Sequence, residues 1–200
     1  MKILIVGGNG TIGSKVSDHF LNEHSVIIAG RTNSDVFVDI TDTKSILKMF
    51  ESLGNVNAII CAAGEAKWEL IDNLSEKDFY IGLTSKLMGQ VNLVRIGKDY
   101  LNPYGSITLT TGIFADKPVK MTTSAAMVNG GIHSFTKAMA LELENGIRIN
   151  VVSPGLVADA YEKYRVFFPG FIPIPMARVV AGYVRSVEGS ETGEIIKIYK

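Results

Sequence analysis

Three glycines at regular spacing, Gly7, Gly10 and Gly13, are the first residues whose pattern suggests chemistry. Apolar residues at positions 3–6 precede them, and apolar residues at helical spacing follow, which predicts a strand, a tight turn and a helix. Glycine lets such a turn bend sharply and approach a pyrophosphate, while the free N–H groups and dipole of the helix attract a phosphate. We therefore expect a nucleotide-binding loop rather than an ordinary strand-to-helix turn. Its predicted cofactor-binding residues are Gly7, Asn9, Gly10, Thr11, Ile12 and Gly13.

A second predicted strand, residues 26–29, ends in Gly30 and Arg31. In a parallel dinucleotide-binding sheet this strand end meets the adenosine ribose, where an acidic residue binds the 2′-hydroxyl of NAD. No acid stands here, and Arg31 can instead pair with a 2′-phosphate, with Thr32 as a further donor. The sequence therefore favours NADP(H) over NAD(H). The alternative is that Arg31 is a solvated loop residue.

Two further strand ends complete the predicted cofactor site. The strand at 36–38 leads to Asp39, which could accept a hydrogen bond from an adenine amino group. The strand at 56–60 leads to four small residues that leave space for a flat ring. Cys61 is interpreted as a small core residue rather than a nucleophile, because no charged activator lies nearby in the sequence. The cofactor residues predicted here are Asp39, Ile40, Cys61, Ala62, Ala63 and Gly64.

Composition excludes several classes of function. Apolar residues make up 46% of the chain, enough for a buried core, and 200 residues fit a single domain over 1–200. The formal net charge is zero, so nothing favours nucleic acid or an anionic membrane surface. The longest apolar-looking segment, residues 166–176, contains prolines and cannot span a bilayer as a helix. A single cysteine suits a reducing compartment, and the early first strand leaves no room for a targeting peptide, so we expect a cytoplasmic protein.

The three histidines are not a metal site by their spacing. His19, His24 and His133 are interpreted as surface or packing residues, and the sequence predicts no bound metal.

Strands alternate with helices along the whole chain, which predicts a parallel sheet covered on both faces. We expect an α/β fold with a Rossmann-type, doubly wound sheet of about seven strands in a three-layer sandwich. Ligands then bind beyond the carboxyl ends of the strands. The later strands are expected at residues 106–110, 148–152 and 194–199, and the later helices after Ser75, over 123–145 and over 178–186.

Beyond these local patterns, the chain resembles the short-chain dehydrogenase/reductase family along essentially all of its length. Residues 7–13 resemble the family's cofactor loop, and residues 61–64 look like a variant of its Asn-Asn-Ala-Gly motif. Residues 135–143 resemble the segment after its catalytic motif, and residues 146–155 closely match its nicotinamide-side strand and loop. The resemblance implies the Rossmann-type fold, an NAD(P)-dependent oxidoreductase, and cofactor contacts from Pro154 and Gly155.

The family's catalytic tyrosine and lysine do not carry over, because their positions fall on Ala125 and Asn129. The family's active-site asparagine falls on Lys86, which could supply the proton or the positive charge once burial lowers its pKa. The family's serine falls on Thr111, whose hydroxyl could orient a carbonyl oxygen. Ser124 lies beside the vacant tyrosine position and could assist. The alternatives are a solvated helix lysine and capping or strand-surface hydroxyls.

These residues predict an NADP(H)-dependent oxidoreductase acting on a small carbonyl or alcohol with an altered proton donor. A binding protein that senses NADP(H) without turnover is the alternative, and an isomerase or dehydratase is a third, weaker one. Residues 160–176 are rich in aromatic side chains, which suggests an apolar or aromatic substrate, a subunit contact or a packed connector. By analogy with the family we expect a homodimer or homotetramer.

Overall fold

Seven parallel strands form one sheet, as expected from the sequence, and the structure places them in the order β3-β2-β1-β4-β5-β6-β7. The structure is a computed structural model, and it describes residues 1–199. The strands are β1 (Lys2–Val6), β2 (Ser25–Gly30), β3 (Val36–Phe37), β4 (Val56–Cys61), β5 (Leu101–Thr110), β6 (Arg148–Pro154) and β7 (Ile195–Ile198).

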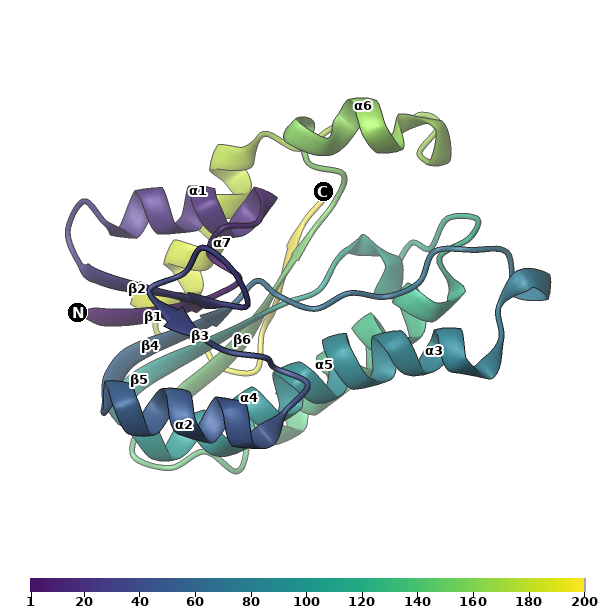
Figure 1. Ribbon diagram of the computed structural model, residues 1–200. Helices are drawn as coiled ribbons and strands as arrows, with labels where there is room; N and C mark the ends of the chain where they lie inside the picture. Colours follow the sequence, from purple (N-terminus) through teal and green to yellow (C-terminus); the bar gives the residue numbers. More distant parts are fainter. Residues whose placement is uncertain (200) are drawn as a thin grey trace.

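Helices cover both faces of the sheet and make three layers (Figure 1). α1 and α7 lie on one face, and α2, α4 and α5 lie on the other. A π-helical turn, Leu83–Met88, joins α3 to α4. No helix within residues 1–199 is long and apolar enough to cross a membrane. The helices are α1 (Thr11–Phe20), α2 (Thr43–Leu53), α3 (Glu76–Gly82), α4 (Gly89–Gly97), α5 (Thr123–Met139), α6 (Tyr161–Tyr164) and α7 (Met176–Glu188).

The central strand β1 shows why this sequence requires two helical layers. Ile3 and Ile5 pack into the core that contains Val16 of α1. Leu4 and Val6 point the other way, into the core under α2, α4 and α5. Since successive side chains of a strand point to opposite faces, a continuous apolar run must be covered on both.

The sheet changes direction beside β1, and this places a binding crevice. The chain proceeds from β1 to β2 and β3 on one side, then returns to β4 on the other side of β1. In open parallel sheets, ligands bind beyond the carboxyl ends of the strands at such a reversal. The loops after β1, β2 and β4 all begin at that edge.

Two predicted boundaries are wrong by more than a residue or two. α5 ends at Met139 rather than near Asn145, and its hydrogen bonds tighten there, with Leu141 N–H donating to the carbonyl of Ala138 (3.1 Å). Leu141 is 88% exposed and two glutamates follow, so burial does not favour another turn and the helix dipole opposes it. β5 begins at Leu101 rather than Ser106, and its register to β4 shifts where residues 102–105 interrupt the pairing. Other predicted ends differ by one or two residues, as helix and strand ends commonly do.

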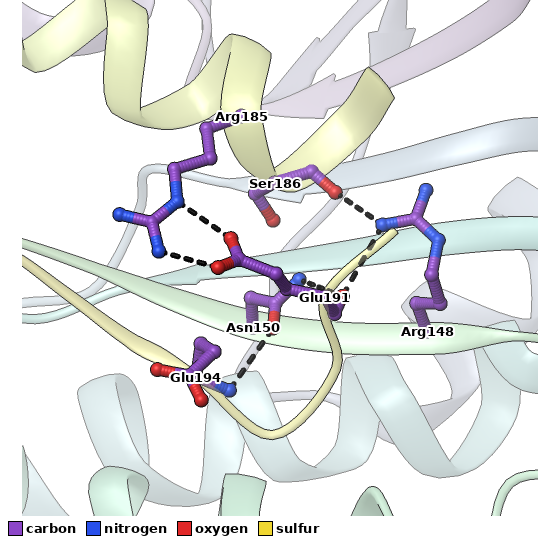
Figure 2. A network of polar contacts seen from close by, with 6 residues as sticks. All are labelled: Arg148, Asn150, Arg185, Ser186, Glu191 and Glu194. Carbon is purple, nitrogen blue, oxygen red and sulfur yellow. Dashed lines mark hydrogen bonds and ion pairs between the residues drawn. The ribbon is translucent and has the colours of Figure 1, made fainter. Parts of the chain in front are cut away.

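A polar network anchors the edge of the sheet near β6 and β7 (Figure 2). Asn150 is fully buried; its Nδ2 donates to the carbonyl of Glu191 (2.9 Å), and its Oδ1 accepts from Glu194 N–H (3.0 Å). Arg148 donates to the last carbonyls of α7, those of Ser186 (2.7 Å) and Val187 (2.8 Å). Cationic donors suit helix C-termini, so the network ties the end of α7 and the turn before β7 to the start of β6.

Candidate cofactor and substrate site

The glycine loop after β1 is packed so closely that two of its glycines cannot be replaced without movement. Gly7 has a φ of +82°, in the left-handed region that L-residues other than glycine rarely adopt. A Cβ on Gly13 would lie 2.1 Å from the carbonyl oxygen of Gly7. The first turn of α1 therefore rests directly on the loop, as the sequence predicts for a phosphate-binding turn.

The start of α1 presents backbone donors with no acceptor in the described part of the chain. Gly10 is the N-cap and provides no side-chain cap, and the first bond across the cap runs from Ser14 N–H to Gly10 O (2.9 Å). The N–H groups of Thr11, Ile12 and Gly13 donate no hydrogen bond within residues 1–199. Free donors together with the positive end of the helix dipole form a site for an anion.

A cavity of about 290 Å³ lies beyond the ends of β1, β2 and β4. Most of the predicted cofactor residues meet there, although the strands that carry them are far apart in sequence. Thr11, Gly13, Cys61 and Ala62 do not line it, and the Cys61 side chain is fully buried in the core. The structure adds lining residues that the sequence did not predict, including Thr41, Glu65 and Ser85. The predicted residues that line it are Gly7, Asn9, Gly10, Arg31, Thr32, Asp39, Ile40, Ala63 and Gly64.

Arg31 and Asp39 both line this cavity, but within residues 1–199 only Asp39 is held in place by hydrogen bonds. The Asp39 carboxylate accepts from the backbone N–H and the hydroxyl of Thr41 (2.9 and 2.8 Å). These bonds, aided by the nearby charge of Arg31, hold the pKa of Asp39 below its usual value. Arg31 is exposed and makes no hydrogen bond or ion pair among residues 1–199. Its guanidinium is therefore free to pair with an anion.

A second cavity, of about 190 Å³, adjoins the ends of β5 and β6. Thr111, Pro154 and Gly155 line it, together with Ile12 from the first turn of α1. Gly10 lines the first cavity and Ile12 the second, so both cavities border the turn that leads from the glycine loop into α1. The structure thus brings the predicted nicotinamide-side residues together with Thr111.

Aromatic side chains form the outer wall of this second cavity. Trp68 lies 4.9 Å from Phe114 and 5.2 Å from Tyr164, measured between ring centroids. Phe114 lies 5.8 Å from Phe168 in the same way. Tyr164 and Phe168 belong to the segment 160–176, so this segment packs over the strand ends and makes the cavity apolar.

Lys86 and Ser124 lie near the site but line neither cavity. Lys86 sits in the π-helical turn against Gly64, where a Cβ on the glycine would be 2.8 Å from the Lys86 Cα. Burial lowers the pKa of Lys86, and the Cys61 thiol beside it opposes the shift. Ser124 is fully buried, and its hydroxyl has no hydrogen-bond partner within residues 1–199.

The two positions on which the sequence resemblance places the family's tyrosine and lysine, Ala125 and Asn129, are buried in α5. Ala125 is 4% exposed and Asn129 is 2% exposed. The Asn129 amide donates to the carbonyl of Gly112 (3.4 Å), while its Oδ1 has no partner in the described chain. Neither side chain can transfer a proton, so any such group must come from elsewhere.

His133 is a polar neighbour of the site that the sequence analysis did not identify. Its Nε2 lies 2.9 Å from the Thr111 hydroxyl oxygen. Burial lowers the pKa of His133, the Asp116 carboxylate opposes this, and Lys197 and Lys137 add to it. A signal was available, because His133 follows Ala125 and Asn129 at intervals of four residues and so shares their helix face. Residues 1–199 contain no group of three His, Cys, Asp or Glu side chains that could hold a metal.

Comparisons with known proteins agree with this geometry. A family model described as Enoyl-(Acyl carrier protein) reductase matches residues 16–180. The short-chain dehydrogenase/reductase ATR9 of Stachybotrys chlorohalonatus is 26% identical over 183 residues, which cover 76% of this chain and 72% of the relative. The glucose and ribitol dehydrogenase homolog 2 of Arabidopsis thaliana is 27% identical over 111 residues; the match covers 55% of this chain but only 38% of that relative.

Solved structures match over nearly the full chain. The protein lin1944 of Listeria innocua is 45% identical, with a TM-score of 0.98 and coverage of 100% of both chains. A small-chain dehydrogenase in complex with NADPH is 28% identical, with a TM-score of 0.87 and coverage of 99% of this chain and 96% of that one.

Proposed function

Because the chain belongs to the short-chain dehydrogenase/reductase family, we propose that it is an NADP(H)-dependent oxidoreductase of a small carbonyl or alcohol substrate with an altered proton donor. One observation carries the proposal. Gly10, the N-cap of α1, and the free Arg31 line one cavity, while Ile12 from the first turn of α1 lines a second cavity together with Thr111 and its hydroxyl.

The residues present fit NADPH at this place. The close packing of Gly13 on Gly7 exposes the backbone donors that a pyrophosphate needs. Arg31, at the end of β2, would pair with the 2′-phosphate, and Asp39 keeps one carboxylate oxygen free for an adenine amino group. The NADPH complex of the 28% identical dehydrogenase supports the same choice. NADPH would supply the hydride to the substrate carbonyl carbon.

The chain's own residues would position the carbonyl and handle its proton. Thr111 would hold the carbonyl oxygen by a hydrogen bond in the second cavity. Lys86, desolvated beside Gly64, would provide positive charge or a proton near the cofactor, and the orphaned Ser124 hydroxyl would support that side. The aromatic wall around Trp68 and Phe168 would exclude water and favour a small apolar or aromatic substrate.

We also propose a cellular compartment and an oligomeric state for this protein. The single thiol, Cys61, is free and buried, which suits a reducing, cytoplasmic compartment. By analogy with its family the protein would be a homodimer or homotetramer.

A second function, NADP(H) sensing without turnover, is favoured by one specific observation. Ala125 and Asn129 stand where the sequence resemblance would place the family's proton donor and its supporting lysine. General acid catalysis typically contributes about 10²–10⁴-fold, so its loss slows a reaction without forbidding it. The two functions share the cofactor site and differ only in turnover.

The first experiment is a fluorescence titration of the purified protein with NADPH and with NADH. Tight NADPH binding and weak NADH binding are expected. Arg31→Ala removes a charge-assisted contact worth about 1.5–3 kcal/mol, which weakens NADPH binding by roughly 10- to 100-fold. Lys44→Ala, an exposed lysine of α2 outside the cavity, is the matched control and keeps wild-type affinity. If neither nucleotide binds at millimolar concentration, both functions are wrong.

Single-turnover oxidation of bound NADPH separates enzyme from sensor. The enzyme oxidises it when benzaldehyde, cyclohexanone or diacetyl is added, and Thr111→Val slows the reaction while leaving NADPH affinity unchanged. A protein that binds NADPH tightly and leaves it intact with all three carbonyls is a sensor.

A further inference from the structure

Thr111 and His133 form a hydroxyl–imidazole pair at the inner end of the substrate cavity. Thr111 follows β5 and is 7% exposed, and it lines the cavity beside Pro154 and Gly155. On its other side the hydroxyl lies 2.9 Å from Nε2 of His133, on α5. His133 itself is only partly buried. The pair therefore links the cavity to a ring that water can reach.

Three charged groups, from three elements, act on His133. Asp116 lies in the loop after β5, Lys197 on β7, and Lys137 one turn further along α5. Asp116 is itself held by Lys197 (2.8 Å) and by the hydroxyl of Tyr199, so its charge is partly compensated. Burial is the largest influence and lowers the pKa of His133 below its usual 6.5. The ring is therefore mostly neutral at pH 7.

We propose that His133 exchanges the reaction's proton with solvent through the hydroxyl of Thr111. Thr111 is then the catalytic residue that contacts the substrate oxygen, and His133 is a positioning residue that orients the hydroxyl and shares its proton. This inference rests on the proposed oxidoreductase function. It names the altered proton donor, a role for which Ala125 and Asn129 are unsuited.

The proton steps balance in both directions. During alcohol oxidation the substrate hydroxyl gives its proton to Thr111 Oγ1, and the original Thr111 proton passes to Nε2 of neutral His133. The alcohol carbon loses a hydride, which NADP⁺ accepts under the proposed function. The imidazolium then releases a proton to water. During carbonyl reduction each transfer runs in reverse, so His133 must begin protonated.

The kinetic test compares His133→Gln with the wild type from about pH 5 to about pH 9, in both directions. Benzaldehyde with NADPH and benzyl alcohol with NADP⁺ are the probes. In the wild type, as the pH rises through the His133 pKa, which lies below 6.5, kcat for reduction falls because the imidazolium is lost, and kcat for oxidation rises because neutral His133 can accept the proton. Gln can keep a hydrogen bond to Thr111 but cannot titrate. We expect His133→Gln to abolish this pH dependence of kcat and to lower kcat by about 10²-fold, with NADPH affinity unchanged.

A double-mutant cycle and an NMR titration complete the test. If the two residues act as one unit, adding Thr111→Val to His133→Gln causes no further loss of kcat. Without any cofactor, the histidine NMR signal that is absent in His133→Gln titrates below 6.5, and its pKa changes in Thr111→Val. If His133→Gln keeps the wild-type pH dependence of kcat, or if Thr111→Val leaves the pKa of His133 unchanged, the proposed proton exchange through Thr111 and His133 is wrong, while the proposed function still stands. Tight NADPH binding with no turnover overturns the proposed function instead.

Discussion

Replacing Gly13 by alanine tests how the cofactor loop is built. A Cβ at this position would lie 2.1 Å from the carbonyl oxygen of Gly7 and 2.9 Å from the Cα of Gly8. All the nearest atoms belong to the backbone, so no flexible side chain can move aside. The loop and the first turn of α1 must separate by about 1 Å, since real Cβ contacts stay beyond 3.0 Å.

The energetic cost follows from this overlap. Overpacking a close contact typically costs about 1–3 kcal/mol, and each kcal/mol lowers the Tm of a domain of this size by about 2–4 °C. The same movement displaces the N–H groups that would hold the pyrophosphate. Because hydrogen bonds weaken steeply with distance and angle, we expect NADPH affinity to fall by at least about tenfold.

The matched control is Gly130→Ala in the middle of α5, where a new Cβ meets nothing within 4 Å. Alanine is favoured over glycine inside a helix by about 0.8–1.0 kcal/mol, so this variant is expected to be more stable than the wild type. Urea unfolding followed by Trp68 fluorescence, together with NADPH titration, measures both quantities. Gly13→Ala with wild-type unfolding and wild-type NADPH affinity would refute the packing described for the loop.

Two further predictions concern stability. Asn150→Leu leaves Glu194 N–H without its partner and leaves the Glu191 carbonyl with only the long bond from Arg148 (3.4 Å), so we expect a loss of about 1–3 kcal/mol in the free energy of unfolding. Glu191→Gln removes only an exposed ion pair and changes the urea midpoint little; equal effects of the two variants would contradict the network in Figure 2. His133 has a lowered pKa in the folded state, so its contribution to stability is complete above pH 6.5 and declines as the pH falls through the lower folded-state value. His133→Gln should therefore reduce the fall in the free energy of unfolding between about pH 7 and about pH 5. A fall as steep as in the wild type would contradict a lowered His133 pKa.

Local patterns in the sequence were sufficient for the fold class and for much of the cofactor cavity. The apolar run of β1, the glycines after it and the alternation of strands with helices each depend on neighbouring residues. Parallel strands place their carboxyl ends at one edge of the sheet, so residues that follow strands are brought together by topology alone. Gly10, Arg31 and Ala63 therefore meet in one cavity, as predicted.

Helix and strand ends were less predictable, because distant packing decides them. The segment 140–145 has a helical composition, yet Leu141 finds no core to enter and the helix stops at Met139. Cys61 is the last residue of β4 rather than the first residue after it; its side chain is buried in the core, as interpreted from the sequence, and does not line the cavity.

What the sequence by itself determined was the fold class, the family and the glycine loop, because each depends on residues close together in the chain. Only the tertiary structure decided which side chains share the chemistry. Lys86 lies in the π-helical turn against Gly64, whereas Thr111 follows β5 and lines the second cavity. His133 reaches Thr111 only because α5 packs beside the end of β5. That contact joins residues 22 positions apart, and no local pattern of residue types could specify a 2.9 Å approach.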